Sequence, residues 1–135
     1  MPYGKDFLFV DGFEHISEQG AKGYYTYKKD EYFYKAHFPH QAVTPGVIMI
    51  ETMAQIGLVG LGMYLTEAHL TGIHKDFVLV ATDVIFSKKV FPEETVFVTS
   101  EKLYFRFGKL KCKVIMTNTK DEIVCSGTLS GVVLS

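Results

Sequence analysis

Two residues of opposite acid–base character lie fourteen positions apart in the segment KAHFPHQAVTPGVIMIETMAQ, residues 35–55. His37 precedes a proline-containing stretch, and Glu51 interrupts an apolar run. Neutral imidazole is a common general base, and burial raises a carboxyl pKa so that the group holds its proton near neutral pH. Brought together in a dry site, the two groups could remove one proton and donate another. The alternative interpretation is a structural histidine and a buried helix with one acidic residue.

A long apolar helix is expected to position Glu51. Residues 46–65, GVIMIETMAQIGLVGLGMYL, contain only four polar side chains. The length would permit a membrane span. Glu51 and Gln55 share one helical face, however, and a spanning helix with such groups normally needs a polar bundle around it. The sequence offers no second span, so we expect a central helix covered by protein on all sides and no membrane association.

The rest of the chain predicts β-strands. Strand-like pieces are centred on residues 12–17 and 23–29, with a glycine-bearing turn between them, and residues 30–46 are expected to be irregular. After the helix, four segments are rich in β-branched and aromatic residues and alternate partly at period two: 76–90, 94–107, 109–119 and 122–135. Their lengths favour an antiparallel meander. A curved sheet around one helix gives a single α+β domain over residues 1–135.

Composition narrows the function classes. Fourteen basic and fifteen acidic residues give a net charge of −1, without the basic excess that nucleic-acid binding requires. Arg106 is the only arginine, which argues against an arginine clamp as the main binding device. Cys112 and Cys125 are expected to be buried free thiols, as in a reducing compartment. The first residues lack the pattern of a signal peptide, so a cytoplasmic location is expected.

Nine residues of this segment match a known signature at its spacing. The signature reads H-F-P-G-x-P-x-x-P-G-V-x-x-x-E-x-x-A-Q. The positions that match it here are His37, Phe38, Pro39, Pro45, Gly46, Val47, Glu51, Ala54 and Gln55. The segment thus resembles the β-hydroxyacyl-acyl-carrier-protein dehydratases of fatty acid synthesis, FabZ/FabA-like proteins with the hot-dog fold. FLFVDGF and VIFSKKVFPEE are also similar to segments of that family.

The resemblance implies a function and a site. A 3-hydroxyacyl thioester on acyl carrier protein would lose water to give a trans-2-enoyl thioester, without a cofactor or metal. His37 would be the base, Glu51 the acid, and the Gly46 amide the donor to the thioester oxygen. The substrate-binding residues implied are Phe38, Pro45, Val47 and Gln55. The family also implies a homodimer, or a trimer of dimers, in which His37 of one chain faces Glu51 of the other.

Two departures leave other interpretations open. His40 stands where the family has glycine, and Ala42 stands where it has a second proline, so the geometry of this loop can differ. A hot-dog thioesterase is one alternative. A non-catalytic dehydratase-like subunit that binds carrier protein or completes a heterodimer is another. His37 and His40 form an H-x-x-H pair, but a metal site is disfavoured because no third ligand follows at a regular spacing.

Overall fold

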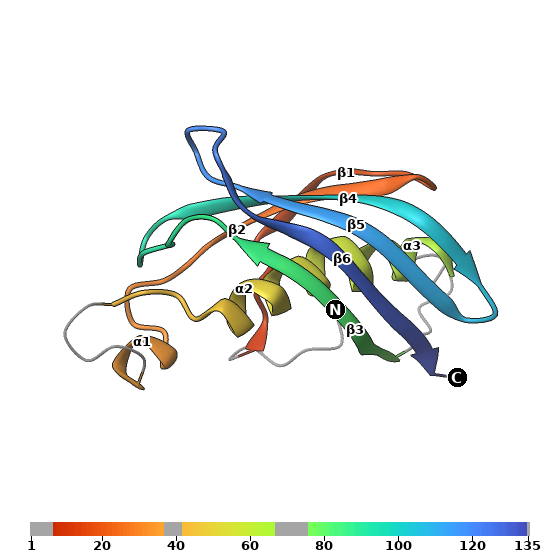
Figure 1. Ribbon diagram of the computed structural model, residues 1–135, viewed down its shortest axis with the longest axis horizontal. Helices are drawn as coiled ribbons and strands as arrows, with labels where there is room; N and C mark the ends of the chain where they lie inside the picture. Colours follow the sequence, from red (N-terminus) through yellow and green to blue (C-terminus); the bar gives the residue numbers. More distant parts are fainter. Residues whose placement is uncertain (1–6, 37–41, 67–75, 135) are drawn as a thin grey trace.

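Alternation of apolar and polar residues produces six strands in the described residues. The computed structural model describes residues 7–36, 42–66 and 76–134, and its strands form one antiparallel sheet in the order β1-β2-β4-β5-β6-β3 (Figure 1). On β5, Leu110, Cys112 and Val114 are fully buried, and the lysines between them point away from the core. The strand bounds are β1 Gly12–Ile16, β2 Gly20–Thr26, β3 Asp76–Phe86, β4 Thr95–Arg106, β5 Lys109–Thr117 and β6 Ile123–Leu134.

The predicted central helix is confirmed, although its backbone is not α-helical throughout. It consists of α2 (Gly46–Met53), the π-helical segment η2 (Ala54–Gly60) and α3 (Leu61–Leu65). Every residue of η2 is buried. The helix is long and apolar enough to cross a membrane, but 72% of its most apolar window is buried inside the protein, which makes it a core helix.

The sheet curves over this helix, as Figure 1 shows, and the N-terminal segment adds further cover. Glycines allow close approach between the two layers. A Cβ on Gly57 would lie 3.0 Å from the Cβ of Ser100 on β4, and one on Gly60 would lie 2.5 Å from the Phe13 ring on β1. Phe9 from the N-terminal segment is fully buried in the same core. The α+β class with a curved sheet around one helix is therefore confirmed.

The predicted meander is correct for β4, β5 and β6 and wrong for β3. Strand β3 pairs with β6 at the sheet edge, with Phe86 opposite Cys125 and Asp76 opposite Leu134. The connection from β3 to β4 instead passes the start of the helix, where the Val90 carbonyl accepts a hydrogen bond from the Thr44 amide at 2.8 Å. Because Val90 is fully buried, this connection forms part of the core.

Two smaller expectations also need correction. Strand β2 begins at Gly20, within the predicted turn, because Gly20 and Ala21 already pair with β4. The segment expected to be irregular contains a short helix, α1 (Phe33–Ala36). Its aromatic side chains explain the ordering: Phe33 and Tyr34 are both buried in the core. Both cysteines are buried and free, as predicted.

Substituting Gly127 by alanine should destabilise the sheet. A Cβ at this position would overlap the Asp83 carbonyl oxygen on the neighbouring strand, and the Val84 Cα would lie 2.8 Å away. Both obstacles are backbone atoms, so the strands must shift, at a cost of about 1–3 kcal/mol. Urea denaturation would measure the loss. Ser126→Ala, the matched change one residue earlier on β6, should cost less than about 0.5 kcal/mol; equal losses in both variants would contradict the packing argument.

Candidate active site

Glu51 lies on the second turn of the helix and is half-buried. Burial raises the pKa of its carboxyl group, and a hydrogen bond from Gln55 opposes that shift. Ile48 and Met49, which precede Glu51 on the helix, are buried in the core. A carboxyl group with a raised pKa holds a proton closer to neutral pH and can act as a general acid.

The fully buried side chain of Gln55 fixes the orientation of Glu51. Gln55 Nε2 donates to Glu51 Oε2 at 2.9 Å and to the Phe7 carbonyl at 2.8 Å. Gln55 Oε1 accepts from the Phe9 amide at 2.7 Å. One amide therefore ties the N-terminal segment to the helix and holds the carboxylate one turn away. Gln55 therefore supports Glu51 and the N-terminal segment; substrate binding by Gln55 stays a prediction.

The start of the helix provides amide donors near Glu51. Pro45 is the N-cap residue, and its carbonyl accepts from the Ile48 and Met49 amides at 3.0 and 3.1 Å. Helix geometry leaves the first amides, those of Gly46 and Val47, without a carbonyl partner in the helix. The helix dipole adds positive potential at this end. The arrangement can therefore stabilise a developing negative charge on an oxygen placed there.

An aromatic ring lies directly against this helix start. The ring of Phe86, at the end of β3, is 3.0 Å from the point where a Cβ on Gly46 would lie. Any larger residue at position 46 would displace the ring or the helix. Val47 is 72% exposed on the same helical face as Glu51, whereas Pro45 is buried. The described residues therefore leave an open apolar surface beside the carboxyl group.

Two predicted site residues, His37 and Phe38, lie outside the described residues. His40, one of the two departures from the signature, also lies outside them, whereas Ala42 is described and exposed. The structure thus brings together Glu51, Gln55 and the amides of Gly46 and Val47. The pairing of His37 with Glu51 stays a prediction.

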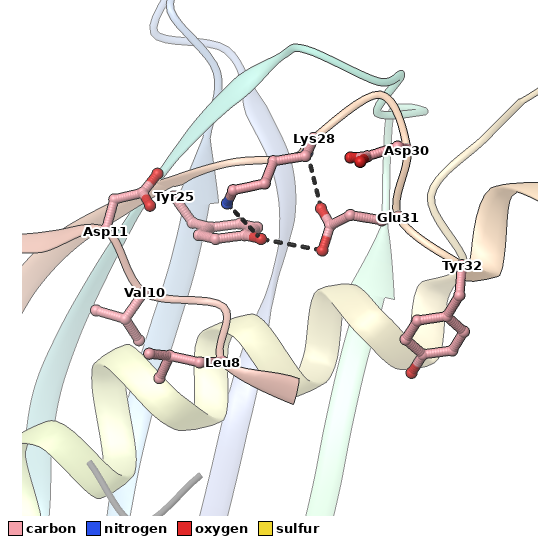
Figure 2. Close-up of a pocket in the computed structure, with 8 residues that line it drawn as sticks. All are labelled: Leu8, Val10, Asp11, Tyr25, Lys28, Asp30, Glu31 and Tyr32. Atoms are coloured by element: carbon pink, nitrogen blue, oxygen red, sulfur yellow. Dashed lines mark hydrogen bonds between the residues drawn. The ribbon is translucent and has the colours of Figure 1, made fainter. Parts of the chain in front are cut away.

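A cavity of about 700 Å³ opens between the N-terminal segment and the residues after β2 (Figure 2). The Tyr25 hydroxyl in its wall donates to Glu31 at 3.0 Å and accepts from Lys28 Nζ at 3.1 Å. Its other lining residues are Leu8, Val10, Asp11, Asp30 and Tyr32. Neither Glu51 nor Gly46 lines this cavity, so it is separate from the candidate site. Within the described residues, no group of three or more histidine, cysteine or acidic side chains could hold a metal ion.

Hydrogen-bonded tyrosine–threonine pairs were not anticipated from the sequence. The Tyr34 and Thr44 hydroxyls are 2.6 Å apart, and so are those of Tyr27 and Thr52. The members of each pair lie ten and twenty-five positions apart, with no motif to connect them. The sequence shows many tyrosines before the helix, but this frequency does not indicate which residues their hydroxyl groups bond.

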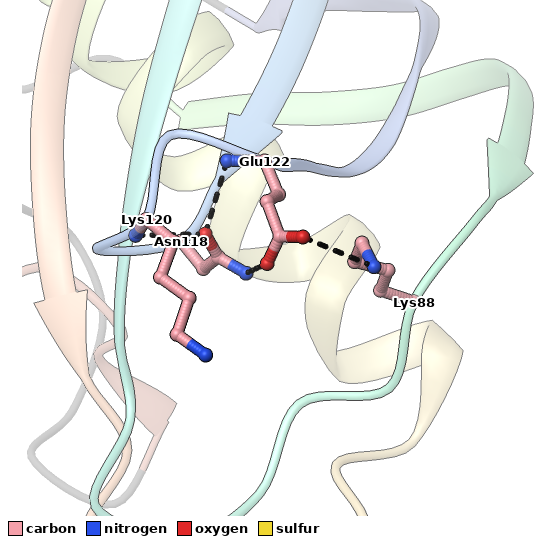
Figure 3. A network of polar contacts seen from close by, with 4 residues as sticks. All are labelled: Lys88, Asn118, Lys120 and Glu122. Carbon is pink, nitrogen blue, oxygen red and sulfur yellow. Dashed lines mark hydrogen bonds and ion pairs between the residues drawn. The ribbon is translucent and has the colours of Figure 1, made fainter.

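Glu122 provides a comparison for Glu51, because its carboxyl group is exposed and paired with a lysine. It accepts a hydrogen bond from Asn118 Nδ2 at 3.0 Å and pairs with Lys88 at 3.3 Å (Figure 3). These partners lower the pKa of Glu122, whereas burial raises that of Glu51. The two carboxyl groups should therefore affect stability in opposite ways as pH changes.

We expect the free energy of unfolding to fall, relative to Glu51→Gln, as pH rises from 4.5 to the folded-state pKa of Glu51. In that window the unfolded chain releases the proton while the folded chain retains it, because the folded-state pKa lies above the ordinary value of 4.5. For Glu122→Gln the sign reverses, because the folded-state pKa of Glu122 lies below 4.5. The free energy of unfolding of wild type should rise, relative to that variant, as pH rises from this lowered pKa to 4.5. Urea titrations across pH 3–8 would measure both; trends of the same sign would contradict the assigned environments.

A family model and sequence relatives match nearly the whole of this chain. A family model described as a FabA-like domain matches residues 1–127. The 3-hydroxyacyl-[acyl-carrier-protein] dehydratase FabZ of Clostridium perfringens is 32% identical over 133 residues, covering 96% of this chain and 89% of the relative. The corresponding FabZ of Caldicellulosiruptor saccharolyticus is 32% identical over 132 residues, which again cover 96% of this chain and 89% of the relative.

Solved structures extend the comparison to the fold. The dehydratase heterocomplex ApeI:P from Xenorhabdus doucetiae superposes with a TM-score of 0.81 at 13% identity, covering 100% of this chain and 88% of that one. Zebra fish thioesterase superfamily member 2 superposes with a TM-score of 0.70 at 12% identity, again covering 100% of this chain and 88% of that one. Such low identities support the shared hot-dog fold alone. The family match, together with the relatives, establishes that this chain belongs to the FabZ/FabA family of hot-dog-fold proteins.

Proposed function

We propose that this chain dehydrates (3R)-3-hydroxyacyl thioesters carried by acyl carrier protein to trans-2-enoyl thioesters, in fatty acid or related lipid or polyketide biosynthesis. The main support is Glu51, a half-buried carboxyl group with a raised pKa, oriented by Gln55 within the family signature. Relatives over nearly the whole chain are named as dehydratases of this type. The proposed compartment is the cytoplasm, where free thiols such as Cys112 and Cys125 persist.

In the proposed reaction, His37 removes the proton on C2 of the substrate. The electron pair left on C2 delocalises onto the thioester oxygen, where the amides of Gly46 and Val47 would stabilise the charge. As that pair returns, the C2–C3 double bond forms and the C3–O bond breaks. Glu51 donates its proton to the departing oxygen, which leaves as water. Transfer of the proton from imidazolium to carboxylate restores both groups.

We further propose that the site is completed by a second copy of the chain. Strand β3 is an edge strand of eleven residues without proline or lysine, so its outer backbone groups can pair with another strand. Val78, Val80 and Ile85 on it are 45%, 51% and 72% exposed. Antiparallel pairing of two β3 edges would bury these residues and give a two-fold homodimer. Three such dimers could form a hexamer.

A basic surface on the hairpin of β4 and β5 fits the acidic carrier protein. These two strands contain five basic residues and one acid, in a chain whose net charge is −1. Arg106, Lys109, Lys111 and Lys113 take part in neither ion pair of the described residues. The Val133 amide donates to the Gly108 carbonyl at 2.8 Å, which places the hairpin tip near the Asp76 end of β3. In the proposed dimer that end lies beside the Phe86 end of the second copy.

A second candidate function is that of a partner subunit in a heteromeric dehydratase. His40 replaces the signature glycine in the segment that carries His37, and a substitution there can remove activity while the fold persists. The structural neighbour from Xenorhabdus doucetiae is a dehydratase heterocomplex. Purified chain with no activity alone, but with activity after addition of a dehydratase-like partner, would favour this candidate.

Hydration of a crotonyl thioester, the reverse reaction, tests the proposed function. Wild type should reduce the enoyl absorbance without releasing free thiol, and His37→Ala and Glu51→Gln should each lower kcat by about 10²–10⁴-fold. Glu14→Gln, an exposed acid paired with Lys22, is the matched control and should leave kcat unchanged. Thiol release at the rate of substrate loss would identify a thioesterase instead. Full activity in either site variant would contradict the assigned roles.

Placing a charge on the β3 edge should disrupt the proposed dimer. Val80→Lys would introduce an ammonium group where two strands meet, so we expect a shift toward monomer and a parallel loss of activity. Ile123→Lys is the control, because Ile123 is similarly exposed, at 49% against 51%, but lies on β6. Sedimentation velocity would measure the distribution. An unchanged dimer in Val80→Lys would place the interface elsewhere.

Charge reversal on the hairpin should affect carrier-bound substrate alone. Lys109→Glu combined with Lys111→Glu should lower kcat/KM for an acyl-carrier-protein thioester by about tenfold or more, most strongly at low salt. The corresponding coenzyme A thioester, which lacks the acidic protein, should react as in wild type. Lys29→Glu, an exposed lysine after β2, provides the control. Equal losses with both thioesters would rule out a docking role.

A further inference from the structure

Two backbone groups of the N-terminal segment fix which way the side-chain amide of Gln55 faces. The Phe9 N–H donates to Gln55 Oε1 at 2.7 Å, and the Phe7 carbonyl accepts from Gln55 Nε2 at 2.8 Å. An amide N–H can only donate and a carbonyl oxygen can only accept. A flipped amide would therefore set donor against donor and acceptor against acceptor. Because Gln55 is 0% exposed, water could not replace the lost bonds.

Residues 7–11, here called the N-terminal strap, are held in place by contacts that do not involve the helix carboxyl group. Phe9 is fully buried, and its ring centroid lies 5.7 Å from that of Tyr25 on β2. The Asp11 carboxylate accepts a hydrogen bond from the Thr26 amide, at the end of the same strand, at 2.8 Å. The orientation of the side-chain amide therefore follows from the strap and not from the charge of the carboxyl group.

This orientation determines what the carboxyl group of Glu51 meets. Gln55 Nε2 carries two N–H groups, and it donates to the Phe7 carbonyl and to Glu51 Oε2, the second at 2.9 Å. A neutral carboxyl group has one protonated oxygen, which donates, and one carbonyl oxygen, which accepts. A proton on Oε2 would point at an N–H group and break the bond. The neutral form of Glu51 is therefore compatible with Gln55 only when its proton is on Oε1.

We propose that the N-terminal strap, acting through Gln55, places the acidic proton of Glu51 on Oε1, so that the departing hydroxyl group of the substrate is protonated from that oxygen. This inference rests on the proposed function. In the step, the Oε1–H bond breaks, the proton joins the departing oxygen, and the C3–O bond of the substrate breaks to release water. The carboxylate that remains keeps the Gln55 donor at Oε2.

Gln55 and Phe9 are in this view positioning residues, whose role requires no contact with substrate. Displacement of a reacting group by about 1 Å can cost about 10²-fold in rate, so rotation of the carboxyl group alone would affect kcat. The donor at Oε2 also lowers the pKa of Glu51, against the rise that burial causes. The same hydrogen bond thus orients the acid and limits how firmly it holds its proton.

Infrared difference spectra across the titration of Glu51 test which oxygen carries the proton, without any need for activity. Glu51→Gln identifies the carbonyl band of the neutral group by its absence. If Oε2 is the carbonyl oxygen, the hydrogen bond from Gln55 lowers its stretching frequency. Gln55→Met, of similar length but without a donor, should then raise both that frequency and the pKa at which the band appears. An unchanged frequency in Gln55→Met would overturn the proposal.

Thr52→Val is the matched control for Gln55→Met. Thr52 is adjacent to Glu51 on α2, is 0% exposed, and donates from its hydroxyl group to the Ile48 carbonyl at 2.8 Å. The control therefore removes a buried hydrogen bond from the same helix but leaves the donor to Glu51 in place. Its carbonyl band should coincide with that of wild type.

Crotonyl-thioester hydration supplies the second readout. We expect Gln55→Met to lower kcat about 10–100-fold with KM within about threefold, and Thr52→Val to match wild type. Equal kcat values in the two variants would overturn the positioning role. An inactive wild type would refute the proposed function, and the infrared band would still decide where the proton lies.

Substitutions of Phe9 test the strap itself. Phe9→Ala and Phe9→Leu should loosen the strap to different degrees, so the band should move toward its position in Gln55→Met, further in Phe9→Ala. Leu110→Ala is the control, because it also truncates a fully buried side chain but lies on β5, where it pairs with Phe105. A wild-type band in folded Phe9→Ala would overturn the role of the strap. Phe9→Leu decides in the same way if Phe9→Ala does not fold.

Discussion

An apolar helix that must be covered on all sides is the constraint on which the rest of the structure depends. The sheet covers one side of it, and the N-terminal segment adds cover through Phe9. Gln55 connects these parts, since its buried amide group bonds Phe7, Phe9 and Glu51 at once. Loss of one partner would leave buried polar groups unsatisfied, at about 1–3 kcal/mol each.

The side of the helix that the described residues leave open explains why fold and proposed function belong together. Val47 and Glu51 occupy one helical face, and β3 is an edge strand of the described sheet with exposed valine and isoleucine side chains. A second copy that covered these surfaces would also exclude water from the carboxyl group. Desolvation would then raise the pKa of Glu51 further, which favours the protonated form that a general acid needs. Burial of apolar surface at the proposed interface would thus both favour the dimer and raise the pKa of Glu51.

Much of the fold could be predicted from the sequence because local patterns determine local structure. Strand-like composition, with partial alternation in the four later segments, indicated all six described strands, although β2 begins earlier than predicted, and the apolar run indicated the helix. The position of β3 beside β6 could not be inferred, because period-two alternation specifies a face and not a neighbour. The π-helical segment was missed for a similar reason, since an apolar run does not reveal how its backbone winds. At the site, the Gln55–Glu51 contact followed from helical spacing, whereas Tyr34–Thr44 joins residues that no pattern relates.

Complementation between two inactive variants tests the central claim, that His37 of one chain acts with Glu51 of another. Equal amounts of His37→Ala and Glu51→Gln would be dissociated, mixed and reassembled. Random pairing makes half of the dimers mixed, each with one intact site, so activity should return to about a quarter of the wild-type level. Mixed dimers that form, as native mass spectrometry would show, and yet remain inactive would contradict a shared site.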